Sequence, residues 1–194
     1  MRPDPDFRPI VTERLLLRRS RAEDAETISA YRSDPDVHRY QGWDRTDPDG
    51  VREEIERMSE RPPGDPAGWV QLSVEERATG ALVGDVGLSP AEGEVGVIKL
   101  GYTMSPAFQG RGYATEAVTA LVTYAFETLQ ADMVRIHANE VNVPSIRVAQ
   151  KAGLHLIERI ERSYEGEVWF GVRYELRRQD FEIETPKPGR TSHP

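Results

Sequence analysis

Apolar residues recur along this chain at two spacings, and each spacing predicts one kind of element. Alternation of apolar and polar residues predicts strands, whereas apolar residues three and four positions apart predict amphipathic helices. The predicted strands cover residues 15–17, 69–75, 81–88, 95–104, 133–138, 154–164 and 168–177. The predicted helices cover residues 21–32, 111–128 and 143–152, together with one that begins after Asp47-Pro48. Hairpins therefore lie beside a strand–helix–strand unit, and we predict an α/β (α+β) domain with a mixed sheet.

The apolar pattern stops toward both ends of the chain, which sets the expected domain boundaries. Residues 1–10 are rich in Pro and Asp and predict an N-terminal arm. Residues 181–194 contain several prolines and no apolar periodicity, so we predict a disordered tail. Residues 11–180 form the predicted domain, and a length of 194 residues fits one such unit.

Composition narrows the classes of partner. Lys and Arg together number 25 and Asp and Glu number 33, so the net charge is −8. A diffuse acidic surface disfavours nucleic-acid backbones and anionic membranes. It is compatible with cationic amines, although acidic surfaces are commonly only solvated. We therefore predict neither a nucleic-acid nor a membrane partner, and the sequence is compatible with a homodimer.

The absence of cysteine and the character of the first residues bear on location and metal binding. With no Cys, disulfides, thiolate nucleophiles and Cys-based zinc sites are excluded, and a reducing compartment fits. The first residues lack the apolar segment of a signal peptide, and no apolar run approaches the ~20 residues that span a bilayer. We predict a cytoplasmic protein. The histidines show no metal-ligand spacing, so no metal is expected.

The segment that follows Met104 carries the clearest candidate chemistry. A predicted strand ends there, and a loop with two glycines and an arginine leads directly into the helix of residues 111–128. Amides at a helix N-terminus attract anions, glycine lets a phosphate approach the backbone, and arginine adds a permanent cation. A plain glycine turn that feeds a helix is the competing interpretation. The candidate anion-binding residues are Gln109, Gly110, Arg111, Gly112, Tyr113, Ala114 and Thr115.

Two common phosphate-binding loops do not match this segment. A Walker loop needs Gly-x-x-x-x-Gly-Lys-Ser/Thr, which the chain lacks. A dinucleotide fingerprint needs Gly-x-Gly-x-x-Gly, and Gly110 and Gly112 supply its first two glycines, but Thr115 stands at the third. The acidic residue expected at the end of the next strand is also missing, because Asp132 precedes that strand. A Rossmann-type oxidoreductase is therefore the weaker alternative.

Three segments together resemble the GCN5-related N-acetyltransferases. Residues 109–114 (Gln-Gly-Arg-Gly-Tyr-Ala) resemble the acetyl-CoA loop of that family. Residues 142–145 (Asn-Val-Pro-Ser) and 151–154 (Lys-Ala-Gly-Leu) look like its Asn-x-x-Ser…Lys-x-Gly-Phe element. Residues 12–18 (Thr-Glu-Arg-Leu-Leu-Leu-Arg) are similar to the opening strand of the branch that contains the ribosomal-protein N-terminal acetyltransferases.

The resemblance implies a twisted mixed sheet flanked by helices. The strands of residues 95–104 and 133–138 are expected to splay apart around acetyl-CoA, which serves as the acyl-donor substrate. The pantetheine chain would follow the first of these strands near its end, and the pyrophosphate would rest on the amides of the glycine-containing loop. The implied acetyl-CoA contacts are Tyr102, Thr103, Met104, Gln109, Gly110, Arg111, Gly112, Tyr113, Ala114, Thr115, Asn142 and Ser145.

The residues that many family members use for proton transfer differ in this chain. Lys99 stands where many members carry a glutamate that acts as base, and Ala149 stands where many carry a tyrosine that acts as acid. Ser145 is the next catalytic candidate near the sulfur, although a serine in the first turn of a helix also bonds backbone. Asp85 is the candidate base if its face of the strand turns toward the cleft. A surface aspartate is the alternative.

Two further positions concern the acceptor side of the expected cleft. Tyr40 and Trp43 lie between the first two predicted helices, where this family's acceptor site has its lid. We expect these aromatic residues to face substrate or to anchor the core. His137 alternates with Ile136 on a predicted strand, and we expect it to be half-buried scaffold rather than a base.

These expectations converge on an acyltransferase that moves an acetyl group from acetyl-CoA to a primary amine. The acceptor would be a protein N-terminus or a small-molecule amine. The absence of the usual acid and base keeps a noncatalytic acyl-CoA-binding or sensor domain of the same fold as an alternative.

Overall fold

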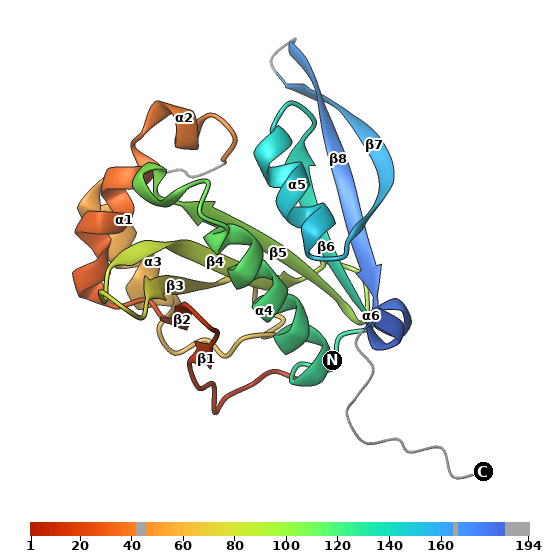
Figure 1. Cartoon of the computed structure of the whole chain (residues 1–194), viewed down its shortest axis with the longest axis horizontal. Coiled ribbons are helices and arrows are strands. Elements are labelled where there is room, and N and C mark those ends of the chain that lie inside the picture. Colours follow the sequence, from red (N-terminus) through yellow and green to blue (C-terminus); the bar gives the residue numbers. More distant parts are fainter. Residues whose placement is uncertain (42–45, 165–166, 185–194) are drawn as a thin grey trace.

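The computed structural model describes residues 1–41, 46–164 and 167–184. Within them, an eight-stranded sheet has the order β1-β2-β3-β4-β5-β6-β8-β7 (Figure 1). Its strands are β1 (Ile10–Val11), β2 (Leu15–Arg19), β3 (Val70–Glu76), β4 (Leu82–Pro90), β5 (Val97–Met104), β6 (Met133–Asn139), β7 (His155–Tyr164) and β8 (Glu167–Arg177). Strands β5 and β6 run parallel and the other described pairs are antiparallel, so the predicted mixed sheet is confirmed.

Helices cover both faces of this sheet. Helices α4 and α5 lie on one face, and α1 and α3 lie on the other (Figure 1). The short helix α2 follows α1 near the end of the sheet where α5 begins. The helices are α1 (Ala25–Arg32), α2 (Pro35–His38), α3 (Pro48–Met58), α4 (Tyr113–Glu127), α5 (Val143–Lys151) and α6 (Arg178–Glu184), with single 3₁₀ turns at Ala22–Asp24 and Pro106–Phe108.

The main core lies between the sheet and α4. Val118 and Leu121 of α4 are fully buried against the sheet residues Ile98 and Leu100. The predicted apolar face of residues 95–104 is therefore confirmed. Removing a side chain of this size from water contributes about 1.5–3 kcal/mol, so this layer holds β5 in place at the edge of the site.

The opposite face is more polar and is closed by buried ion pairs. The Arg18 guanidinium donates two hydrogen bonds to the Asp24 carboxylate, at 2.7 and 2.9 Å, and both residues are buried. The Ser73 hydroxyl of β3 also donates to Asp24, at 2.9 Å. These contacts tie the start of α1 to strands β2 and β3.

At both ends of the predicted domain, structured residues extend beyond the predicted boundaries. The Arg2 amide donates to the Leu129 carbonyl at 2.7 Å, and the Tyr124 hydroxyl donates to Asp4 at 2.6 Å, so the N-terminal arm lies against the domain. Helix α6 continues through Glu184. The predicted tail of residues 181–194 is therefore helical over its first four residues, and residues 185–194 lie outside the described part. Across the described residues, no helix is both long and apolar enough to span a membrane.

Strands β5 and β6 diverge, as predicted. Their parallel pairing ends at Leu100 and Ile136, yet β5 continues to Met104 and β6 continues to Asn139. Figure 1 shows the two strands spreading apart toward the end of the molecule where α2 and α5 lie. Beyond Leu100, the β6-facing backbone of β5 is therefore open to a cleft.

Candidate active site

A cleft of about 710 Å³ fills the gap between the diverging strands. Its walls come from the ends of β5 and β6, the loop that enters α4, the first turns of α5, and the segment from α2 to residue 41. A volume of this size lies within the range of ~300–1,000 Å³ that holds small-molecule ligands. Most of the site residues predicted from scattered parts of the sequence line this cleft, whereas Asp85 and Arg111 do not.

The loop that enters α4 is shaped for an anion. Gly110 and Gly112 adopt left-handed φ angles of +74° and +83°, and Gly112 is the residue at which α4 starts. A Cβ at Gly110 would meet no heavy atom within 4 Å, so a ligand has free access to this backbone. The first amides of α4 have no partner inside the helix, and the exposed Arg111 lies beside them. A helix dipole, open amides and a nearby cation are the features that attract an anion to a helix N-terminus.

A second arginine supports this loop from behind. Nε of Arg14 donates to Glu116 at 2.7 Å, and its Nη1 donates to the Arg111 carbonyl at 3.0 Å. The Thr12 hydroxyl and the Arg14 amide both donate to the same Glu116 carboxylate, at 2.5 and 2.8 Å. The guanidinium also lies 4.7 Å from the centre of the Tyr113 ring. The Thr-Glu-Arg segment before β2 thus holds the loop against the first turn of α4.

A pair of hydroxyl groups lies on the α4 and α5 side of the cleft. The Tyr102 hydroxyl donates to the Ser145 carbonyl at 2.7 Å and lies 2.7 Å from the Ser145 hydroxyl. Either hydroxyl can act as the donor in the contact between the two oxygens. The Asn142 side chain accepts from the Ser145 amide at 3.2 Å and caps α5. Burial raises the pKa of Tyr102 to about 12, so both hydroxyls keep their protons near neutral pH.

The remaining predicted contacts on β5 also line the cleft. Thr103 and Met104 follow Tyr102 along its wall, and the Gln41 side chain donates to the Thr103 hydroxyl at 3.2 Å. This bond links the segment after α2 to the sheet. Tyr40 lines the cleft beside Gln41, whereas Trp43 lies outside the described residues.

Asp85 does not reach the cleft. It was a candidate base only if its face of the strand turned toward the cleft, and that condition is not met. Asp85 is only 1% exposed, its carboxylate accepts hydrogen bonds from the Tyr31 hydroxyl and the Gln71 amide, and it is absent from the cleft walls. The alternative of a surface aspartate is equally wrong. Burial raises the pKa of Asp85 to about 6, and the nearby Arg32 opposes that rise. This carboxylate joins α1 to the sheet.

Two features of the cleft were not predicted from the sequence. The resemblance implies only a pantetheine contact for Tyr102, yet its phenol lies 2.7 Å from the Ser145 hydroxyl. His137 was expected to be half-buried, but it is exposed and lines the cleft. The first depends on the packing of α5 against β5 and has no sequence signal. The second follows from strand register, which the sequence alone does not give.

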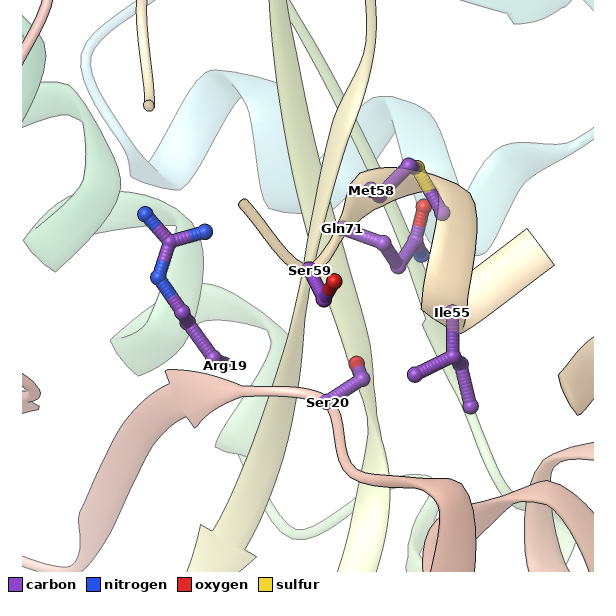
Figure 2. A pocket seen from close by; sticks show the side chains of 6 residues that line it. All are labelled: Arg19, Ser20, Ile55, Met58, Ser59 and Gln71. Carbon is purple, nitrogen blue, oxygen red and sulfur yellow. The ribbon is translucent and has the colours of Figure 1, made fainter. Parts of the chain in front are cut away.

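A much smaller hollow lies apart from the cleft, between α3 and the start of β3. Arg19, Ser20, Ile55, Met58, Ser59 and Gln71 surround it (Figure 2). Its volume of about 10 Å³ is close to the space that one water molecule occupies. It therefore cannot take a substrate. Among the described residues, no cluster of three or more His, Cys, Asp or Glu side chains is arranged to hold a metal ion.

Comparison with known proteins agrees with this geometry. A family model described as an acetyltransferase (GNAT) domain matches residues 14–155. The uncharacterized N-acetyltransferase p20 of Bacillus licheniformis is 31% identical over 151 residues, which cover 75% of this chain and 84% of p20.

Solved structures share the fold. A Vibrio cholerae protein provisionally named a ribosomal-protein-serine acetyltransferase is 29% identical, with a TM-score of 0.72, and the match covers 89% of this chain and 98% of that one. RimL, a ribosomal L7/L12 alpha-N-protein acetyltransferase in complex with coenzyme A, has a TM-score of 0.74 at 15% identity, covering 88% of this chain and 98% of RimL. The RimL likeness shows the fold alone.

Proposed function

The chain belongs to the GNAT family of acetyltransferases, and we propose that it transfers the acetyl group of acetyl-CoA to a primary amine. The acceptor is the N-terminus of a protein or peptide, or a small-molecule amine. One observation carries the proposal: the glycine-containing loop, the open backbone of β5 and the hydroxyl pair all border the same cleft.

The residues of this cleft fit acetyl-CoA. The left-handed glycines and the amides of α4 suit a pyrophosphate, with Arg111 supplying positive charge. The backbone from Gly101 to Met104, which β6 no longer pairs, suits the amides of the pantetheine chain. Asn142 and Ser145 then lie near the thioester end. The coenzyme A bound to RimL, a protein of the same fold, supports this choice of acyl donor.

The hydroxyl pair suits the departure of the thiolate. When an amine attacks the thioester carbonyl, a C–N bond forms, the C–S bond breaks, and the sulfur needs a proton. Ser145 can donate its proton to the sulfur and recover one from Tyr102 through the contact between their oxygens. We assign Ser145 as the acid and Tyr102 as the group that restores its proton.

The acceptor enters from the side of α2. Tyr40 borders the cleft there, and the carboxylates of Asp34 and Asp36 line the same wall, where they favour a cationic amine. The name of the Vibrio cholerae relative supports a protein N-terminus as acceptor. Trp43 stays a proposed substrate contact on the basis of its position in the sequence.

An acceptor screen tests the proposal. Acetyl-CoA is mixed with peptides that carry free N-termini, with polyamines and with aminoglycosides, and released CoA thiol and the mass of the acetylated product are measured. We expect amine-dependent thiol release with at least one class. Tight acetyl-CoA binding without acetylation of any amine would instead support the noncatalytic sensor.

A further inference from the structure

His137 stands at the point where the two central strands separate. The last parallel pair of β5 and β6 joins Leu100 to Ile136. Gly101 and His137 are the next residue of each strand, so they lie at the apex of the cleft. Gly101 has no side chain, and on the sheet face that His137 shares, a Cβ at Gly101 would meet Trp69 at 2.9 Å. Of these two residues, His137 is therefore the one that places a reactive side chain at the apex of the cleft.

The imidazole and the hydroxyl pair lie on opposite sides of the thioester position. His137 follows Ile136, whose buried side chain belongs to the α4-side core, so the imidazole lies on the other face of the sheet. Tyr102 points toward α5 on the α4 side, where it contacts Ser145. A thioester that lies along the open backbone of β5 would have its sulfur near the hydroxyls. The opposite face of the thioester carbonyl would then be open to attack by an amine beside His137.

The chemistry of the cleft walls singles out this histidine. The other ionisable groups among the described lining residues are aspartates, tyrosines, arginines and a lysine. Histidine is the side chain whose ordinary pKa lies nearest neutral pH, where it can accept a proton from an ammonium group and release it to water. Asp85 is buried away from the cleft, and Lys99 carries no carboxylate.

We propose that His137 is the general base that accepts a proton from the acceptor amine, an inference that rests on the proposed acetyltransferase function. The neutral imidazole takes one proton from the ammonium and passes it to solvent. The free amine then attacks the carbonyl carbon, and the thiolate leaves as the C–S bond breaks. The second amine proton passes to water as the amide forms. It balances the proton that Ser145 gives to the sulfur, which the pair of hydroxyls regains from solvent.

Charged groups around His137 are largely engaged with one another. Arg173 is its register partner on β8 and pairs with Glu158 of β7 at 3.0 Å. Arg135, two residues earlier on β6, bonds Glu94 of the β4–β5 loop at 2.5 Å and Glu175 of β8 at 2.7 Å. Asp34, Asp36 and Arg39 of the α2 segment line the same cleft. Lys99 of β5 is the register partner of Arg135. The Arg135 pairs and the Arg173 pair should persist in a variant that changes only the imidazole.

A pair of variants tests the proposal. His137→Gln removes the base, and His155→Gln changes an exposed histidine of β7 that is outside the cleft. Turnover is measured over a range of pH with a peptide amine that the wild type acetylates, and acetyl-CoA affinity is measured by calorimetry. We expect His137→Gln to lower kcat by ~10²–10⁴-fold with little change in affinity. The loss should shrink as pH rises, because free amine becomes available without a base. His155→Gln should match the wild type.

Wild-type kcat and an unchanged pH profile in the folded His137→Gln variant would overturn the proposal and leave the acetyltransferase function intact. A wild-type protein that binds acetyl-CoA but acetylates no amine would instead overturn the proposed function and this inference with it. NMR of the imidazole gives a reading without turnover. The His137 signals should shift when acetyl-CoA is added while those of His155 stay unchanged, and unmoved His137 signals would place the imidazole away from the thioester.

Discussion

Gly112 holds a backbone conformation that side chains rarely adopt. Its φ of +83° is the left-handed conformation from which α4 begins at Tyr113. A Cβ there would also lie 3.4 Å from Nη2 of Arg14. A side chain at this position would therefore strain the backbone before α4 and crowd the supporting arginine.

Gly112→Asp should abolish or strongly weaken coenzyme A binding. It adds a strained Cβ and a negative charge beside the proposed pyrophosphate position, and we expect a loss of affinity of about tenfold or more. Gly80→Asp is the matched control, because Gly80 has a φ of +73° with nothing within 4 Å of its Cβ position. Calorimetry on both folded variants is the measurement, and equal affinities would contradict the phosphate-loop assignment.

The contact between Tyr102 and Ser145 predicts coupled effects on turnover. Ser145→Ala should lower kcat more than it weakens acetyl-CoA binding, within the ~10²–10⁴-fold range of a general acid. Tyr102→Phe should give a smaller loss, because serine still reaches the sulfur. The double variant should lose less than the product of the two single losses. Multiplicative losses in a double-mutant cycle would show that the two hydroxyls act independently.

For Asp85, we predict an effect on stability rather than on catalysis. Its folded pKa of about 6 lies above the ordinary value of 3.8, so the folded chain binds the proton more tightly than the unfolded chain. Stability from this group is present at low pH and is lost as pH rises from about 4 to about 6. The gap between these two pKa values corresponds to roughly 3 kcal/mol of stability.

Asp85→Asn should therefore gain stability relative to the wild type as pH increases through this window. Denaturant unfolding at about pH 4.5 and about pH 7 measures the change, and the exposed Glu92→Gln serves as control. A wild-type-minus-variant difference that stays constant between the two pH values would show that Asp85 does not titrate in this way.

At the scale of elements, the segment before β2 acts on the loop before α4. Residues 12–14 and the first turn of α4 are about a hundred positions apart in sequence, yet the Glu116 carboxylate accepts hydrogen bonds from Thr12 and Arg14. Because Arg14 also bonds the Arg111 carbonyl, its loss frees the loop on the side away from the cleft. The motif at the start of the domain thus helps to shape the proposed anion site.

Arg14→Ala should weaken coenzyme A binding severalfold, with a smaller effect on kcat at saturating acetyl-CoA. Arg77→Ala is the control, since Arg77 bonds the carbonyls of Thr12 and Glu13 but does not contact Glu116. Affinity for coenzyme A is measured for both, together with Glu116→Gln and the Arg14→Ala/Glu116→Gln double variant. Additive losses in that cycle, or an equal loss in Arg77→Ala, would argue against a specific support.

Local elements were predictable where one short stretch determines them. The alternating residues of β5 and the glycines before α4 are contiguous in sequence. The strand face agrees with the structure, and α4 begins at Tyr113, two residues after the predicted start. The start of α1 was less accurate. The helix predicted over residues 21–32 opens with a 3₁₀ turn at Ala22–Asp24. Asp24 accepts from the Arg21 amide, at 2.8 Å, and Arg18 holds its carboxylate there. Tertiary ion pairing decided the cap.

At the scale of the molecule, the site depends on the order of strands rather than on any one segment. The resemblance to a family predicted the divergence of β5 and β6, whereas the sequence pattern alone predicted only a mixed sheet. The positions of His137, Tyr102 and Asp85 relative to the cleft follow from register between strands and from the packing of α5. These are nonlocal properties, and alternation along one strand cannot supply them.

The central claim is that acetyl-CoA occupies the gap between β5 and β6, and amide hydrogen exchange with and without acetyl-CoA tests it most directly. We predict increased protection at Gly101 to Met104, at residues 109–115 and at the start of α5. The outer strand β7 should exchange unchanged. Protection confined to segments outside the cleft, or none at saturating acetyl-CoA, would contradict the account.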